Sequence, residues 1–113
     1  MFNPAHLSVT FRNLAGALAA YREDLAISQR LAAADPANAG WQRDLSYSHT
    51  IIGQVLVKQE QWRDALPHLE TSLQIDERLA ALDPTNVTWQ KDVQISRRLA
   101  AQVRAKLFKG VKP

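Results

Sequence analysis

The chain has 113 residues, the size of one small domain, and 46% of them are hydrophobic. It contains no cysteine, which excludes disulfides, thiolate nucleophiles and cysteine-ligated metals. No apolar run approaches the roughly 20 residues that span a bilayer, and no basic region followed by an apolar stretch marks the N-terminus. We therefore expect a cytoplasmic protein.

The net charge of +3 is distributed unevenly along the chain. Residues 1–90 carry seven basic and ten acidic side chains, a net charge of −3, whereas residues 91–113 carry seven basic and one acidic, a net charge of +6. The basic character therefore belongs to the C-terminal end. This distribution argues against a protein whose whole surface binds nucleic acid.

The sequence contains an internal repeat with a period of 48 residues. When residues 12–58 are aligned with residues 60–106 without a gap, 18 of the 47 pairs are identical. The segment Asp-Pro-Ala-Asn at 35–38 recurs as Asp-Pro-Thr-Asn at 83–86, and Trp41-Gln42 recurs as Trp89-Gln90. Such a period indicates a fold built from stacked supersecondary units.

Four long helices are predicted, after a short N-terminal segment that ends before residue 12. Apolar residues recur every three or four positions in each unit, as in Ala65, Leu66, Leu69 and Leu73, which is the spacing of an amphipathic helix. The predicted helices are 13–34, 39–59, 62–82 and 87–108, followed by a basic end at 109–113. They divide the domain at 1–113 into a half repeat (13–34), a full repeat (39–82) and a second half repeat (87–108).

The residues between these segments predict how each helix begins and ends. Proline disfavours the helical conformation in the residue before it, so each Asp-Pro pair is expected to stop a helix. Asn38 and Asn86 are then placed to accept hydrogen bonds from the first free N–H groups of the next helix. Glu60 and Gln61 are expected to form the tight turn inside the full repeat. The fold class that follows is all-α, an antiparallel stack of helix hairpins.

A helix-turn-helix unit with this pattern of small residues resembles the tetratricopeptide repeat (TPR). Gly53 and Ala65 have the family's spacing of twelve, and Pro84 is in the closing position. Each helix is about one heptad longer than in the usual 34-residue repeat, which keeps the same face toward its neighbour. The chain is similar to long-helix TPR-like arrays of bacterial proteins. The resemblance covers residues 12–108 and implies a scaffold that binds other proteins.

The sequence favours no catalytic, metal or cofactor site. His6, His49 and His68 show no pairing at metal-ligand spacing and are interpreted as packing or surface residues. Asp76 and Glu77 are adjacent on a helix and therefore point in different directions, so a solvated face is expected. The chain is thus predicted not to be an enzyme, and to need neither a cofactor nor a metal ion.

The resemblance also implies a concave groove, lined by the first helices of successive repeats. When Gly53 is matched to the family's glycine, the residues assigned to this groove are Tyr47, Thr50, Gln54 and Lys58. One repeat later they are Arg98, Gln102 and Lys106. Amide and ammonium donors suit the backbone and carboxylates of an acidic peptide. The expected partner is therefore a protein or acidic peptide.

Two further expectations concern the ends of the chain. The basic segment 91–113 supports an alternative function, in which it binds nucleic acid or an anionic membrane. At the other end, the first predicted helix lacks a preceding helix, so Leu14, Leu18, Tyr21 and Leu25 are expected to present an open apolar face. Because large exposed apolar patches mark interfaces, a homodimer through the N-terminal helices is predicted.

Overall fold

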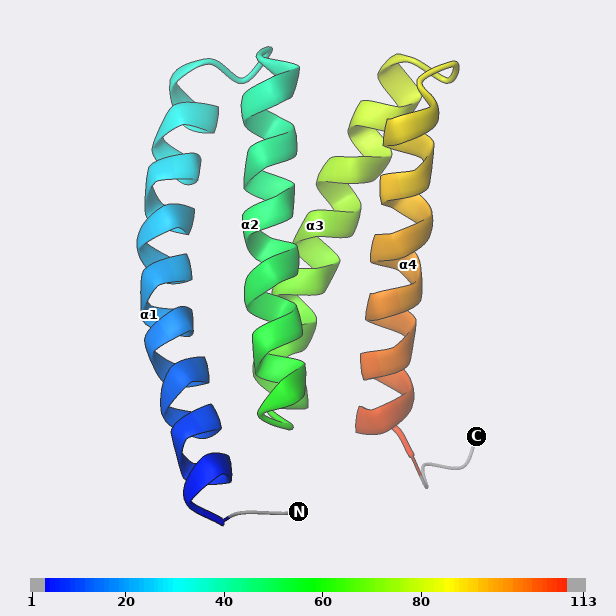
Figure 1. The fold of residues 1–113 in the computed structure, drawn as a ribbon. Coiled ribbons are helices and arrows are strands. Elements are labelled where there is room, and N and C mark those ends of the chain that lie inside the picture. The colour runs from blue at the N-terminus through cyan, green and yellow to red at the C-terminus, as the bar shows by residue number, and fades with distance from the viewer. Residues whose placement is uncertain (1–3, 110–113) are drawn as a thin grey trace.

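The computed structural model describes the backbone of residues 4–109 and the side chains of residues 13–109. This part of the chain forms four helices and no strand: α1 (Pro4–Ala34), α2 (Ala39–Lys58), α3 (Trp62–Leu82) and α4 (Val87–Leu107). Each helix packs against the next and runs in the opposite direction to it (Figure 1). The predicted all-α stack of antiparallel helix hairpins is confirmed.

The order of the helices in space places α2 and α4 on either side of α3. Figure 1 shows α3 running from the C-terminal end of α2 to the N-terminal end of α4, while α1 lies on the other side of α2. The helices α2 and α4 therefore flank one face of α3, and this face is where the candidate site lies.

The two inter-repeat turns are built alike. The side-chain oxygen of Asn38 accepts a hydrogen bond from the backbone N–H of Trp41, and that of Asn86 from Trp89, both at 3.0 Å. These contacts satisfy N–H groups that have no partner inside the helix. The predicted N-caps of α2 and α4 are confirmed.

The glutamine that follows Trp41 or Trp89 forms hydrogen bonds with both the turn and the preceding helix. The Gln42 amide donates to the backbone carbonyls of Ala32 and Pro36, both at 3.3 Å, and Gln90 makes the equivalent bonds one repeat later. Ala32 and Ala80 lie in the last turn of a helix, where carbonyls have no helical donor, and Pro36 and Pro84 lie in the turn that follows. The recurrence of Trp-Gln thus has a local physical reason.

The turn inside the full repeat lies at Glu60 and Gln61, as predicted. Glu60 has φ of 58°, the left-handed conformation that commonly ends a helix. The N–H groups of Glu60 and Gln61 donate to Val57 O and Leu56 O, each at 2.9 Å, and so satisfy carbonyls of the last turn of α2.

The predicted start of the first helix was wrong. The structure continues α1 back to Pro4, where a short separate segment was expected to end before residue 12. Residues 5–12 contain neither glycine nor proline, so nothing interrupts the helix, and proline fits the first turn because its missing N–H has no helical partner there. The repeat alignment begins at residue 12 and gave no signal for the segment before it.

The core runs through all four helices. Its fully or nearly buried members are Leu25, Ile52, Leu56, Ala65, Leu69, Ala100 and Val103. At Gly53 the helices α2 and α3 approach so closely that an added Cβ atom would lie 2.6 Å from Leu69 Cδ2. Gly53 is therefore a contact position between the two helices.

Candidate binding groove

A buried carboxylate of α3 bridges α2 and α4 through hydrogen bonds. Asp76 of α3 is 3% exposed and accepts hydrogen bonds from the hydroxyls of Ser46 on α2, at 2.5 Å, and of Ser96 on α4. Near it, Arg43 Nε of α2 and Asp92 Oδ2 of α4 form an ion pair at 2.8 Å. These contacts link residues of α2 and α4 that are about one repeat apart in sequence.

The environment of Asp76 corrects the expectation that it would face solvent. Burial raises the pKa of the Asp76 carboxyl, and the two serine hydroxyls that donate to it act in the opposite direction. Glu77 is exposed, as expected. The residue equivalent to Asp76 in the preceding repeat is Ser28. Its Oγ lies 3.3 Å from Oγ of Ser48, so a polar contact between α1 and α2 is the counterpart of the contact between Asp76 and Ser96.

The face between α2 and α4 contains a pocket of about 740 Å³. Its floor is apolar and comes from three helices: Val57 of α2, Trp62 and Leu69 of α3, and Leu99 and Val103 of α4. Its rim carries the amides of two glutamines and the ammonium groups of three lysines: Gln54, Gln102, Lys58, Lys106 and Lys109. We call it the lysine-rimmed pocket. No acidic side chain of the described residues lines it.

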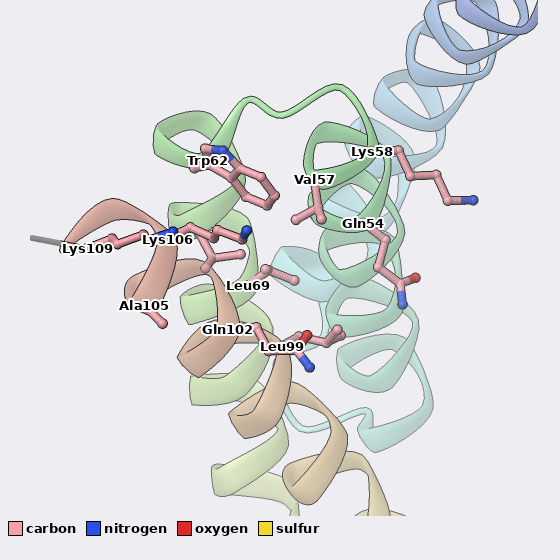
Figure 2. A pocket seen from close by; sticks show the side chains of 11 residues that line it. Gln54, Val57, Lys58, Trp62, Leu69, Leu99, Gln102, Ala105, Lys106 and Lys109 are labelled. Carbon is pink, nitrogen blue, oxygen red and sulfur yellow. The ribbon is translucent and has the colours of Figure 1, made fainter. Parts of the chain in front are cut away.

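The three lysines on this rim do not occupy equivalent positions. Lys106 Nζ lies 5.6 Å from the centroid of the Trp62 ring, a cation–π distance. Figure 2 shows Trp62, Leu69 and Lys106 converging on one space, whereas Lys58 extends away from it. Lys106 is therefore the cation best placed to meet a group bound inside, and Lys58 contributes from the edge.

A second pocket, of about 240 Å³, adjoins the first and shares Gln54 with it. Its lining includes hydroxyl and charged groups, and Asp76 is one of them. The complete lining is Arg43, Ser46, Tyr47, Thr50, Ile51, Gln54, Asp76, Asp92, Ile95 and Ser96. We call it the Asp76 pocket, and the two together the α2–α4 groove.

Six of the seven residues assigned to the groove from the sequence line it. Four of them surround the lysine-rimmed pocket: Gln54, Lys58, Gln102 and Lys106. Tyr47 and Thr50 line the Asp76 pocket. Arg98 is exposed on α4 and lines neither pocket. Of the apolar floor, the sequence assigned only Val57 to the groove. Trp62 and Leu69 belong to α3, outside the recurring positions from which the groove was predicted.

Two histidines form a contact that their sequence positions did not reveal. The Nδ1 atoms of His49 on α2 and His68 on α3 lie 3.0 Å apart, with ring centroids 5.2 Å apart. At this distance one nitrogen donates and the other accepts, so at least one of the two rings is neutral. Burial, followed by the charge of His68, lowers the pKa of His49 to about 4, and burial also lowers that of His68. His6 lies outside the side chains that the structure describes.

The face of α1 differs from the one expected to support self-association. Leu25 is 8% exposed and belongs to the core, and Leu18 packs against that core, so neither is open to a second chain. Leu14 is half-buried, and Tyr21 is 36% exposed.

The exposed apolar side chains of α1 are instead those that a preceding helix would cover. Ile27 and Leu31 are 48% and 40% exposed, whereas their equivalents on α3, Ile75 and Leu79, are 3% and 4% exposed. The same residue types at the same repeat positions are buried on α3, which packs against both α2 and α4. They are exposed on α1, whose main contact among the described residues is with α2.

The basic C-terminal helix has part of its charge engaged within the chain. Arg104 Nη2 lies 3.1 Å from Glu70 Oε2 of α3, and Lys106 lies over Trp62. Arg97 and Arg98 are exposed. The surface available to an anionic partner is therefore smaller than the sequence suggests.

The side chains described for residues 13–109 include no group of three that could hold a metal ion. No helix within residues 4–109 is both long and apolar enough to cross a membrane. Comparisons of the chain with protein-family models, with curated proteins and with solved structures return no match.

Proposed function

We propose that the chain is a non-catalytic, cytoplasmic interaction module of TPR-like type, which binds an acidic peptide segment of another protein in the α2–α4 groove. One observation carries the proposal. The repeat-related pairs Gln54/Gln102 and Lys58/Lys106 come from two helices and line the same pocket. Ammonium and amide donors around an apolar floor are suited to side-chain carboxylates and to the carbonyls of a bound backbone.

The positive charge of the pocket favours a negatively charged partner. Three lysines line it, and within the described residues none of them forms an ion pair. A bound carboxylate would therefore gain a partner without displacing one. Its attraction to lysine is stronger beside an apolar floor than in bulk water, because the local dielectric constant is lower.

The test is a binding titration with dye-labelled acidic and basic peptides of equal length, followed by fluorescence anisotropy. Lys58→Glu with Lys106→Glu reverses two charges in the groove, and Arg30→Glu with Arg97→Glu reverses two exposed charges outside it. We expect the groove variant to lose roughly tenfold or more in affinity for the acidic peptide, and the control to change it by no more than about twofold.

Two outcomes would count against the proposal. No binding of any acidic peptide, or unchanged binding by the groove variant, would remove the groove from consideration. An equal loss in both variants, together with steep salt dependence and binding of duplex DNA or anionic vesicles, would favour the alternative in which the basic segment 91–113 acts as a non-specific anionic-surface binder.

A further inference from the structure

The lysine-rimmed pocket has room for more than a carboxylate. Its volume of about 740 Å³ falls in the range of roughly 300–1,000 Å³ that is usual for ligand pockets. Three helices contribute to its walls, and Trp62 projects into it from the start of α3 (Figure 2). A partner that met the lysines alone would leave this apolar surface in water.

The two halves of the groove differ in chemistry. The lysine-rimmed pocket has three ammonium groups and no carboxylate among its described lining residues. The Asp76 pocket has two carboxylates, Asp76 and Asp92, against the single guanidinium of Arg43, and it is lined by hydroxyls. An acidic residue is therefore attracted to the first half and repelled from the second.

The length of the groove sets the spacing between these halves. Ser46 and Lys58 are twelve residues apart on α2, which is about 18 Å at 1.5 Å per residue. An extended peptide rises about 3.3 Å per residue, so five or six residues cover this length. One short segment can thus reach both pockets.

Resting on the proposed function, we infer that the partner segment carries a bulky apolar side chain directly beside a carboxylate, and a neutral or basic residue about five positions away. The apolar side chain enters the lysine-rimmed pocket against Trp62 and Leu69. The neighbouring carboxylate meets Lys106, and the distant residue lies over the Asp76 pocket. The groove therefore distinguishes the position of a charge along the segment as well as its sign.

Three synthetic peptides of equal length and net charge test this inference. The first has adjacent Glu and Phe with Lys five positions away, the second replaces Phe by Ala, and the third exchanges Glu and Lys. We expect the second and third peptides to bind roughly tenfold or more weakly than the first, because one loses the buried ring and the other places like charges together. The protein is unaltered in this comparison, so folding does not affect it.

The tryptophan of the pocket provides a local readout. In a variant with Trp41→Phe and Trp89→Phe, the remaining Trp62 reports binding at the pocket through a shift in its emission. Ala105→Phe fills the pocket and should abolish this shift, whereas Ala101→Phe, at an exposed alanine of α4 outside the pocket lining, should preserve it. Circular dichroism checks that each variant remains folded.

The outcomes separate this inference from the proposed function. Equal binding of the Phe and Ala peptides, with the lysine dependence intact, overturns the apolar anchor and leaves acidic-peptide binding in place. Equal binding of the first and third peptides overturns the inferred placement of the charges along the segment. If none of the three binds at any accessible concentration, the inference is overturned, and the titration with acidic peptides then decides separately whether the proposed function stands.

Discussion

Replacing Gly53 by alanine should destabilise the fold, whereas the same change at Gly16 should stabilise it. Both glycines lie inside helices, where alanine is favoured by about 1 kcal/mol. At Gly53 the new methyl would lie 2.6 Å from Leu69 Cδ2, in the core, and forcing a methyl into a packed core costs about 1–3 kcal/mol. At Gly16 a Cβ atom meets nothing within 4 Å.

The net change at Gly53 is therefore a loss of about 0–2 kcal/mol, against a gain of about 0.5–1 kcal/mol at Gly16. Urea unfolding followed by circular dichroism measures both. With a slope of about 1–3 kcal/mol per molar urea, a difference of 2 kcal/mol separates the two midpoints by roughly 1 M. Equal stabilisation by the two alanines would refute the close packing of α2 against α3.

Four further predictions follow from the contacts described above. The free energy of unfolding should fall by up to about 3 kcal/mol as the pH drops from about 6.5 to 4, because the lowered pKa of His49 lets the unfolded chain take up the proton first. The variant His49→Gln should flatten this part of the pH profile. The raised pKa of Asp76 acts in the opposite sense. Asp76→Ala should lower the free energy of unfolding by about 2 kcal/mol and speed amide hydrogen exchange mainly in α4, because Ser96 loses its hydrogen-bond partner. Unchanged exchange would show that this carboxylate does not stabilise α4. Asn86→Ala should cost about 1 kcal/mol in thermal or urea unfolding, and no loss would count against the cap. Sedimentation should show a dimer that Ile27→Glu with Leu31→Glu converts to a monomer, and a monomeric parent at high concentration would contradict this.

Most of the fold could be predicted because its signals are local and are repeated. The Asp-Pro and Asn positions stop and start helices through backbone geometry and hydrogen bonds that depend on a few neighbouring residues. The period of 48 then places each later helix by analogy with an earlier one. The helix before residue 12 has no counterpart in the repeat, and for that reason its extent was missed.

The candidate site could be predicted only in part, because some of its groups meet through tertiary packing. Gln54, Lys58, Gln102 and Lys106 recur at a fixed period, so their shared face could be inferred from the sequence. The position of Asp76 could not, because Ser28 occupies its place in the other repeat and nothing local marks it as buried. The contact between His49 and His68 depends in the same way on how α2 meets α3.

The most direct test of the account is a map of amide chemical shifts on addition of the peptide that has adjacent Glu and Phe. If the α2–α4 groove is the binding surface, the largest changes will lie at Gln54, Val57, Gln102 and Lys106, together with the indole N–H of Trp62. Changes concentrated on the outer face of α4 around Arg97, or along α1, would contradict it.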